Sequence, residues 1–182
     1  MATRIQDITL TALFAAIISV SGFVRIPIGP VPLTLQSQAI LISSYCLGWK
    51  KGTVASLIYI ALGLSGVPVF SSGGGPAYVL SPTFGFLAGF VICSAINGFL
   101  SKFNPGNNVL RTYFHMLFSM IFIYIPGLLW LLLILNIIAD TPLKIETILK
   151  TGLFIPFSVD LIKNIPAAFI AARLRKNIYQ SR

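Results

Sequence analysis

The feature that most constrains this chain is a series of long apolar segments separated by short stretches of proline, glycine or charged residues. A helix of about 20 apolar residues crosses a bilayer, so segments of this kind predict membrane spans. Only 9% of the 182 residues are charged, whereas a soluble domain carries about 25%. We predict an all-α membrane protein, with residues 1–182 forming a single transmembrane domain of six helices. The predicted helices cover residues 8–24, 33–48, 53–66, 82–100, 113–138 and 148–174.

The breaks between these segments have a local chemical cause. Residues 25–32 contain three prolines and a glycine, and residues 66–76 contain two prolines and four glycines. Proline removes a backbone donor and glycine favours turns, so neither stretch continues a helix. Polar turns at residues 102–108 and 140–146 supply two further breaks. The sequence contains no tandem repeat, and we expect one bundle rather than two domains.

Basic residues are distributed unequally between the two sets of connecting segments. With a cytoplasmic N-terminus, the outer segments hold three cations, Arg25, Lys144 and Lys150. The cytoplasmic segments hold nine: Arg4, Lys50, Lys51, Lys102, Arg111, Arg173, Arg175, Lys176 and Arg182. The positive-inside rule therefore predicts that both termini are cytoplasmic and that the number of spans is even. Topology and contact with anionic membrane lipid account for the net charge of +9, and we expect no nucleic-acid partner.

One acid and one base lie well inside an apolar segment. Asp160 and Lys163 are three residues apart in the sixth segment, so they share a helix face and can pair. Each costs about 2.5–3.5 kcal/mol at mid-membrane, so neither should face lipid. Their distance from Arg173 along a helix places the pair in the middle and outer part of the membrane. We interpret the pair as a ligand site open to the outside; an ion pair that only fixes helix packing is the alternative.

A glycine-rich stretch lies on the same predicted outer side. The backbone amides of Gly73, Gly74 and Gly75 can approach a ligand closely and bind a carboxylate or carbonyl oxygen. The aromatic rings of Phe70 and Tyr78 can cover an apolar ring. A flexible connector is the alternative interpretation.

Polar residues also begin the second segment near its outer end. Gln36, followed by Ser37 and Gln38, would be costly there unless these side chains face a cavity. We take Gln36 as a further candidate ligand contact. Hydrogen bonding between helices is the alternative.

The first segment carries small residues at helical spacing. Ala12 and Ala16 lie four residues apart, and Thr11, Ala15 and Ser19 form a neighbouring row. Rows of small residues let two helices approach closely. Considered alone, the spacing favours packing against a neighbouring helix of the same chain.

Four motifs occur in order along the chain, and together they cover most of it. They are Pro30-Val-Pro-Leu-Thr-Leu-Gln36, Gly66-Val-Pro-Val-Phe-Ser-Ser-Gly-Gly-Gly75, Ser81-Pro-Thr83 followed by Gly85, and Asp160-Leu-Ile-Lys163. In this order and spacing they resemble BioY, the family of biotin-binding S-components of energy-coupling factor (ECF) transporters. The chain departs from the usual family pattern at residues 76–78, 84–86 and 164–166, all around the expected pocket.

The resemblance implies a six-helix bundle with cytoplasmic termini in a prokaryotic cell membrane, where outer loops cap a high-affinity biotin site. It implies that Ala12 and Ala16 match the family's A-x-x-x-A row, which contacts the coupling membrane subunit. It also implies two ATPase subunits as partners, since this chain lacks a Walker A motif. Asp160 can accept hydrogen bonds from the ureido N–H groups of biotin, and Lys163 can donate to its carbonyl or its carboxylate. The resemblance implies biotin as the ligand, and it implies no cofactor or catalytic residue.

Three other functions remain open from the sequence. An S-component for another vitamin or small heterocycle would use the same architecture. An intramembrane enzyme is a second alternative, although Ser158 and Lys163 lie five residues apart on different helix faces. A structural membrane protein is the third. We expect no metal site, because the chain has one histidine and two cysteines.

Overall fold

The computed structural model describes residues 2–28, 30–138 and 144–180, and most of these residues are helical. The long helices are α1 (Ala2–Ser21), α2 (Gln36–Leu64), α3 (Phe84–Leu100), α4 (Val109–Leu133) and α6 (Ile155–Gln180). Shorter elements are strands β1 (Arg25–Ile26) and β2 (Leu33–Thr34), helix α5 (Ile145–Leu149), the 3-10 helices η1 (Pro76–Leu80) and η2 (Ser101–Phe103), and the π-helical turns η3 (Ile134–Ile138) and η4 (Lys150–Phe154).

Four helical segments are long and apolar enough to cross a membrane. They cover Arg4–Ser21, Phe84–Phe103, Val109–Asn136 and Ile145–Ile178. The last is continuous from α5 through η4 into α6, so the predicted sixth segment begins three residues earlier than expected. Part of the break predicted at residues 140–146 falls outside the described residues.

The second and third predicted segments are two arms of one kinked helix. Gly48, with φ 77° and ψ 174°, is the non-helical residue inside α2, and no loop separates the arms. Each arm, residues 36–47 and 49–64, is shorter than the roughly 20 residues of a straight crossing. The expected count of six separate helices is therefore not confirmed. A positive φ is easily adopted by glycine, which explains how the chain turns sharply without ending the helix.

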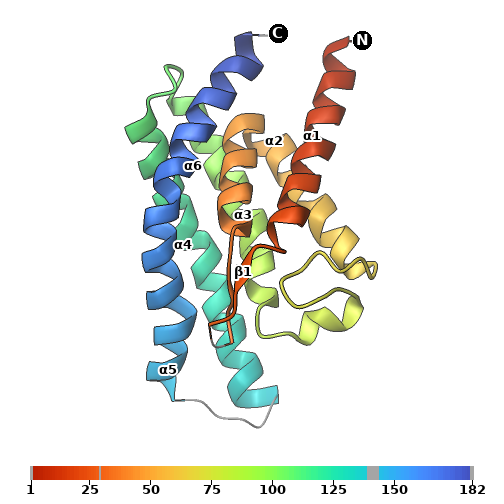
Figure 1. Ribbon diagram of the computed structural model, residues 1–182, viewed down its shortest axis with the longest axis vertical. Helices are drawn as coiled ribbons and strands as arrows, with labels where there is room; N and C mark the ends of the chain where they lie inside the picture. Colours follow the sequence, from red (N-terminus) through yellow and green to blue (C-terminus); the bar gives the residue numbers. More distant parts are fainter. Residues whose placement is uncertain (1, 29, 139–143, 181–182) are drawn as a thin grey trace.

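The two ends of the bundle hold different parts of the chain (Figure 1). Both chain termini lie at one end, together with the kink of α2 and the connection from α3 to α4. The hairpin of β1 and β2, the connection from α2 to α3 and the start of α5 lie towards the opposite end. Strand β1 pairs antiparallel with β2, with Arg25 opposite Thr34. The irregular segments are thus gathered at the end away from the termini.

Glycines allow α3 to pack closely against its neighbours. A Cβ on Gly89 would lie 2.7 Å from the Ile123 carbonyl oxygen of α4. A Cβ on Gly98 would lie 2.5 Å from the Trp49 nitrogen and 2.6 Å from the Trp49 Cα. The kink of α2 therefore rests directly on the last turn of α3, with backbone against backbone.

We expect Gly98→Ala to destabilise the protein, because the added methyl group overlaps backbone that cannot rotate away. Overpacking of this kind costs about 1–3 kcal/mol, so the thermal midpoint of the detergent-purified protein should fall by several degrees. Gly106→Ala is the matched control, since a Cβ there meets nothing within 4 Å. Equal midpoints for the two variants, measured by circular dichroism, would contradict this account of the kink.

Candidate ligand-binding site

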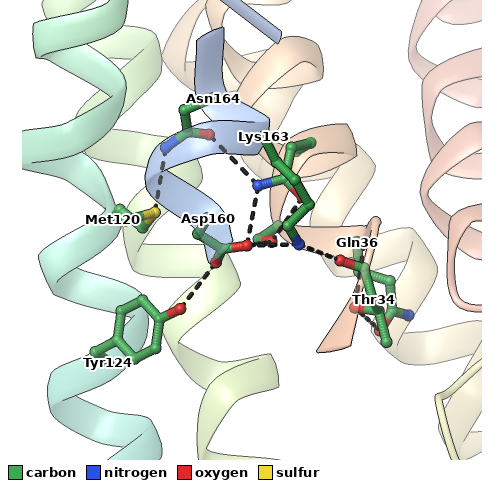
Figure 2. A network of polar contacts seen from close by, with 9 residues as sticks. Thr34, Gln36, Met120, Tyr124, Asp160, Lys163 and Asn164 are labelled. Atoms are coloured by element: carbon green, nitrogen blue, oxygen red, sulfur yellow. Dashed lines mark hydrogen bonds and ion pairs between the residues drawn. The ribbon is translucent and has the colours of Figure 1, made fainter. Parts of the chain in front are cut away.

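The acid and the base of α6 point into the bundle and form an ion pair. Lys163 Nζ lies 2.6 Å from Asp160 Oδ1. Asp160 is only 5% exposed, and Figure 2 shows its carboxylate between α6, α4 and the start of α2. The spacing of three residues places both side chains on one helix face, as the sequence predicts. Neither charge faces lipid.

Three neutral side chains hold the Asp160 carboxylate from other helices. The Tyr124 hydroxyl of α4 donates to Oδ2 at 2.8 Å. From α2, the Ser37 hydroxyl and the Gln38 amide donate to Oδ1 at 3.2 and 3.1 Å. These donors stabilise the charged form of a buried carboxylate and fix its orientation. These hydrogen bonds therefore keep the Asp160 carboxylate in one orientation.

Lys163 connects this network to the hairpin at the end of the bundle. Its ammonium donates to the backbone carbonyl of Thr34, on β2, at 2.7 Å. An ammonium has three N–H donors, and the contacts to Asp160 and Thr34 use two of them. One donor remains for an acceptor placed beside the pair.

A hollow that is open at its mouth borders the pair. About 550 Å³ within it and at its mouth is not filled by protein atoms. Its apolar wall comes mainly from α3, α4 and the first turn of α6, with Phe86, Leu87, Phe90, Ile123 and Pro156. Its polar lining consists of Thr34, Gln36, Ser37, Ser71, Thr83, Tyr124, Asp160 and Lys163. Such a site can enclose a flat apolar ring and bind polar groups at its edges.

Gln36 lines the hollow, but most of its amide is already bonded within the protein. Its Nε2 donates to the Tyr59 hydroxyl at 2.5 Å and to the Val69 carbonyl at 3.4 Å. A Cβ on Gly22 would lie 2.7 Å from the same nitrogen. Gln36 therefore connects the end of α1, α2 and the loop after α2. Its described hydrogen bonds serve this packing, and a ligand contact would come in addition to them.

The two predicted loop aromatics lie behind the lining rather than in it. Phe70 and Tyr78 are not among the residues that border the hollow. The Phe70 ring packs against Tyr78 at a centroid distance of 4.5 Å. The Tyr78 hydroxyl bonds to the hydroxyls of Ser71, at 3.2 Å, and Thr83, at 2.9 Å. Tyr78 thus positions two hydroxyls that do border the hollow.

The three consecutive glycines turn the loop back on α2. Gly73 and Gly75 have φ values of 124° and 101°, a region that favours glycine. The Gly75 amide donates to the Gly63 carbonyl of α2 at 2.7 Å. A Cβ on Gly74 would overlap the Val67 carbonyl oxygen. None of the three borders the hollow, so their described role is to shape the loop.

The hairpin and this loop are joined across the mouth of the site. The Arg25 guanidinium of β1 donates to the Ser71 backbone carbonyl. Val31 and Leu33, which follow in the hairpin, line the hollow together with Ser71. Segments that are far apart in the sequence therefore close one side of the site together.

The two neighbouring rows of small residues on α1 differ in exposure. Thr11, Ala15 and Ser19 are buried within the bundle. Ala12 and Ala16 are exposed on the outer surface of α1. The predicted partner row is thus accessible to another helix, whereas its neighbour packs within this chain.

Several polar residues that border the hollow were not among the candidate site residues chosen from the sequence. Tyr124, Ser71 and Thr83 are three of them. Tyr124 had a usable signal, because a hydroxyl inside an otherwise apolar span needs a buried partner. The two loop hydroxyls belong to motifs of the family resemblance, but serine and threonine are ordinary residues of turns, so their chemistry alone did not mark them as ligand contacts.

Comparisons with known proteins identify the family of the chain. The sequence profile of the BioY family matches residues 1–180. The probable biotin transporter BioY of Pyrococcus horikoshii is 35% identical over 176 residues, which cover 96% of this chain and 99% of that protein. The biotin transporter BioY of Thermotoga maritima is 36% identical over 177 residues, covering 94% and 96% of the two chains.

A solved structure has the same fold. The crystal structure of the S-component for biotin from an ECF-type ABC transporter superposes with a TM-score of 0.83 at 31% identity. The match covers 96% of this chain and 93% of the other. With its apolar helices and prokaryotic relatives, the protein is a multi-pass membrane protein of a prokaryotic cell. The chain belongs to the BioY family.

Proposed function

We propose that this protein captures biotin from outside the cell and delivers it across the membrane as the substrate-binding subunit of an ECF transporter. The observation that carries the proposal is the Asp160–Lys163 ion pair, with its buried carboxylate, beside a hollow that has both apolar and polar lining. Relatives over nearly the whole chain are named biotin transporters. Two buried charges at membrane depth are expensive unless a polar ligand or partner uses them.

The chemistry of the site supports a ligand with a ureido group. Such a group has two N–H donors and a carbonyl acceptor. Asp160 Oδ2 accepts one described hydrogen bond, from Tyr124, and has capacity for another. The unused Lys163 donor complements the carbonyl or the carboxylate of biotin. The aromatic side chains of Phe86 and Phe90 supply an apolar wall for the thioether ring.

The same site supports binding without chemical conversion of the ligand. The Ser158 hydroxyl donates to the Phe154 carbonyl of its own helix turn and is exposed. It therefore does not meet Lys163 to form a nucleophile–base pair. We propose that the protein is not an enzyme and needs no cofactor, and that two ATPase subunits and a coupling membrane subunit drive transport.

The orientation follows from the same proposal. The end of the bundle that holds both termini would face the cytoplasm, because most of the basic residues belong to segments at that end. The hairpin, the glycine-rich loop and the mouth of the hollow would face the outside. Ala12 and Ala16 on the exposed face of α1 would meet the coupling subunit.

Titration of the detergent-purified protein with biotin tests the proposed function. We expect saturable binding of one biotin per chain below micromolar concentration, with biotin recovered unchanged. An analogue that keeps the thioether ring and the carboxylate but lacks the ureido group should bind at least about 100-fold more weakly, because the buried polar groups would be left unpaired. If biotin does not bind at micromolar concentration, an S-component for another vitamin becomes the better explanation.

A further inference from the structure

A cluster of aromatic and basic side chains lies far from the ligand site, where the kink of α2 meets the end of α3. We call Trp49, Lys50, Phe99 and Lys102 the platform. The Nζ atoms of Lys50 and Lys102 lie 5.4 and 5.9 Å from the centre of the Trp49 ring. Lys102 Nζ also lies 5.3 Å from the centre of the Phe99 ring. These distances are within the range of cation–π attraction, which holds the two ammonium groups beside the rings.

The platform is built by the fold rather than by neighbouring residues alone. Trp49 and Lys50 follow the kink of α2, whereas Phe99 lies on α3 and Lys102 on η2. The close backbone contact of Gly98 with Trp49 brings these two segments together. The side chains therefore keep a defined arrangement, unlike isolated lysines on a flexible loop.

The exposure of the platform fits the boundary between membrane and water. Trp49 is 42% exposed and Phe99 is 50% exposed, and both lysines are exposed. The kink of α2 and the α3–α4 connection lie at the end of the bundle that carries the termini (Figure 1). Tryptophan is enriched at membrane interfaces, where its ring contacts acyl chains and nearby cations reach the headgroup phosphates.

The charges of the platform are not balanced within the described part of the chain. Asp7 forms an ion pair with Lys51, the residue after Lys50, at 2.5 Å. The other described ion pair joins Asp160 and Lys163 in the ligand site. No described salt bridge involves Lys50 or Lys102, so both remain able to bind an external anion.

The two ends of the bundle also differ in their cation–π contacts. In residues 2–28, 30–138 and 144–180, the recorded contacts use Lys50, Lys102, Arg173 and Arg175, all basic residues of the end with the termini. The opposite end has Lys144 and Lys150, for which this part of the chain provides no such ring contact. The combination of ring and cation is therefore specific to one side of the membrane.

We propose that the platform is a binding site for an anionic phospholipid of the leaflet next to the termini. The rings of Trp49 and Phe99 would contact the upper acyl chains, and Lys50 and Lys102 would bind the headgroup phosphate. The site would give the protein a preference for phosphatidylglycerol over the zwitterionic phosphatidylcholine. Its occupant differs from the transported ligand and lies at the other end of the bundle.

Native mass spectrometry of the detergent-purified protein tests the proposal. Phosphatidylglycerol and phosphatidylcholine are titrated separately, and the ratio of their apparent dissociation constants is measured. We expect the wild type to prefer phosphatidylglycerol by about tenfold, since each basic residue near an anionic headgroup favours binding by several-fold. Lys50→Gln with Lys102→Gln should reduce this ratio to near one. Lys144→Gln with Lys150→Gln, which removes the same charge at the opposite end, should leave it unchanged.

Further arms of the experiment separate the lipid from other partners. Biotin binding should be equal in both double variants, which shows that they are folded. Glycerol 3-phosphate, a soluble phosphate without acyl chains, should not displace the lipid at equal concentration; displacement would overturn the role of the rings. An unchanged lipid ratio in the platform variant would also overturn the proposal. If that variant keeps its lipid preference but no longer co-purifies with the coupling subunit, the platform is a protein interface instead.

Discussion

Asp160→Asn is expected to weaken biotin binding by at least tenfold. The substitution keeps the size of the side chain but removes the negative charge opposite Lys163, 2.6 Å away. An ammonium left unpaired in a buried site costs several kcal/mol, and Asn also cannot accept the charge-assisted hydrogen bonds that Asp160 receives. Lys163→Ala should cause a comparable loss, because it leaves the carboxylate without its counter-charge and removes a donor beside the hollow. Equilibrium titration with labelled biotin measures both effects.

Glu146→Gln is the matched control, since it removes a carboxylate charge from an exposed position on α5. Its affinity for biotin should equal that of the wild type. Size-exclusion profiles and thermal midpoints of all three variants show whether they remain folded. Wild-type affinity in both Asp160→Asn and Lys163→Ala would mean that the ion pair fixes helix packing and is not the ligand site.

Ala12→Leu combined with Ala16→Leu is expected to abolish most biotin uptake while leaving biotin binding intact. Both alanines are exposed on α1, beside the buried row that includes Ala15. Two leucines on this face would prevent another helix from approaching closely. The hollow lies elsewhere in the bundle, so its affinity should not change. Uptake of labelled biotin into cells that contain the complete ECF complex, compared with binding to the purified variant, measures the separation.

The control for this experiment places the same substitutions on other exposed surfaces. Ala61→Leu with Ala88→Leu adds two leucines at exposed positions of α2 and α3. This variant should take up biotin at the wild-type rate. Normal uptake in the α1 variant would rule out the exposed row as the coupling interface, and reduced binding there would indicate a disturbed fold instead.

Both predictions depend on the ligand site and the exposed alanine row lying on different parts of the bundle. The ligand site uses α2, α3, α4, α6 and the irregular segments at one end, whereas the exposed alanine row belongs to α1. The Arg25 contact with the Ser71 carbonyl links the α1–α2 connection to the loop that borders the hollow.

Much of the candidate site could be predicted from the sequence because charge inside an apolar segment has few explanations. Asp160 and Lys163 stand out against their neighbours, and helical periodicity alone places them on one face. In the structure Asp160 is buried, Lys163 is partly buried, and both border the hollow. The candidate role of Gln36 was harder to judge, because its bonds to Tyr59 and Val69 come from residues distant in the chain.

The loop residues show where a sequence motif is ambiguous. A run of glycines is compatible with a ligand cradle or with a tight turn, since both require positive φ or close backbone approach. In the structure Gly74 and Gly75 approach the end of α2, and Phe70 packs against Tyr78. The residues of this region that border the hollow are Ser71 and Thr83, which lie within the motifs but are of types common in any turn.

The sequence by itself determined that this protein is helical, spans a membrane and buries an acid beside a base. Those properties follow from local rules, because backbone bonds in lipid must be satisfied within each helix and charges there must be paired. Only the tertiary structure decided that the second and third apolar segments are one helix kinked at Gly48, that Tyr124 holds Asp160, and that Trp49 meets Lys102. These features depend on contacts between residues far apart in the chain, and close packing of helix surfaces, rather than local preference, selects them.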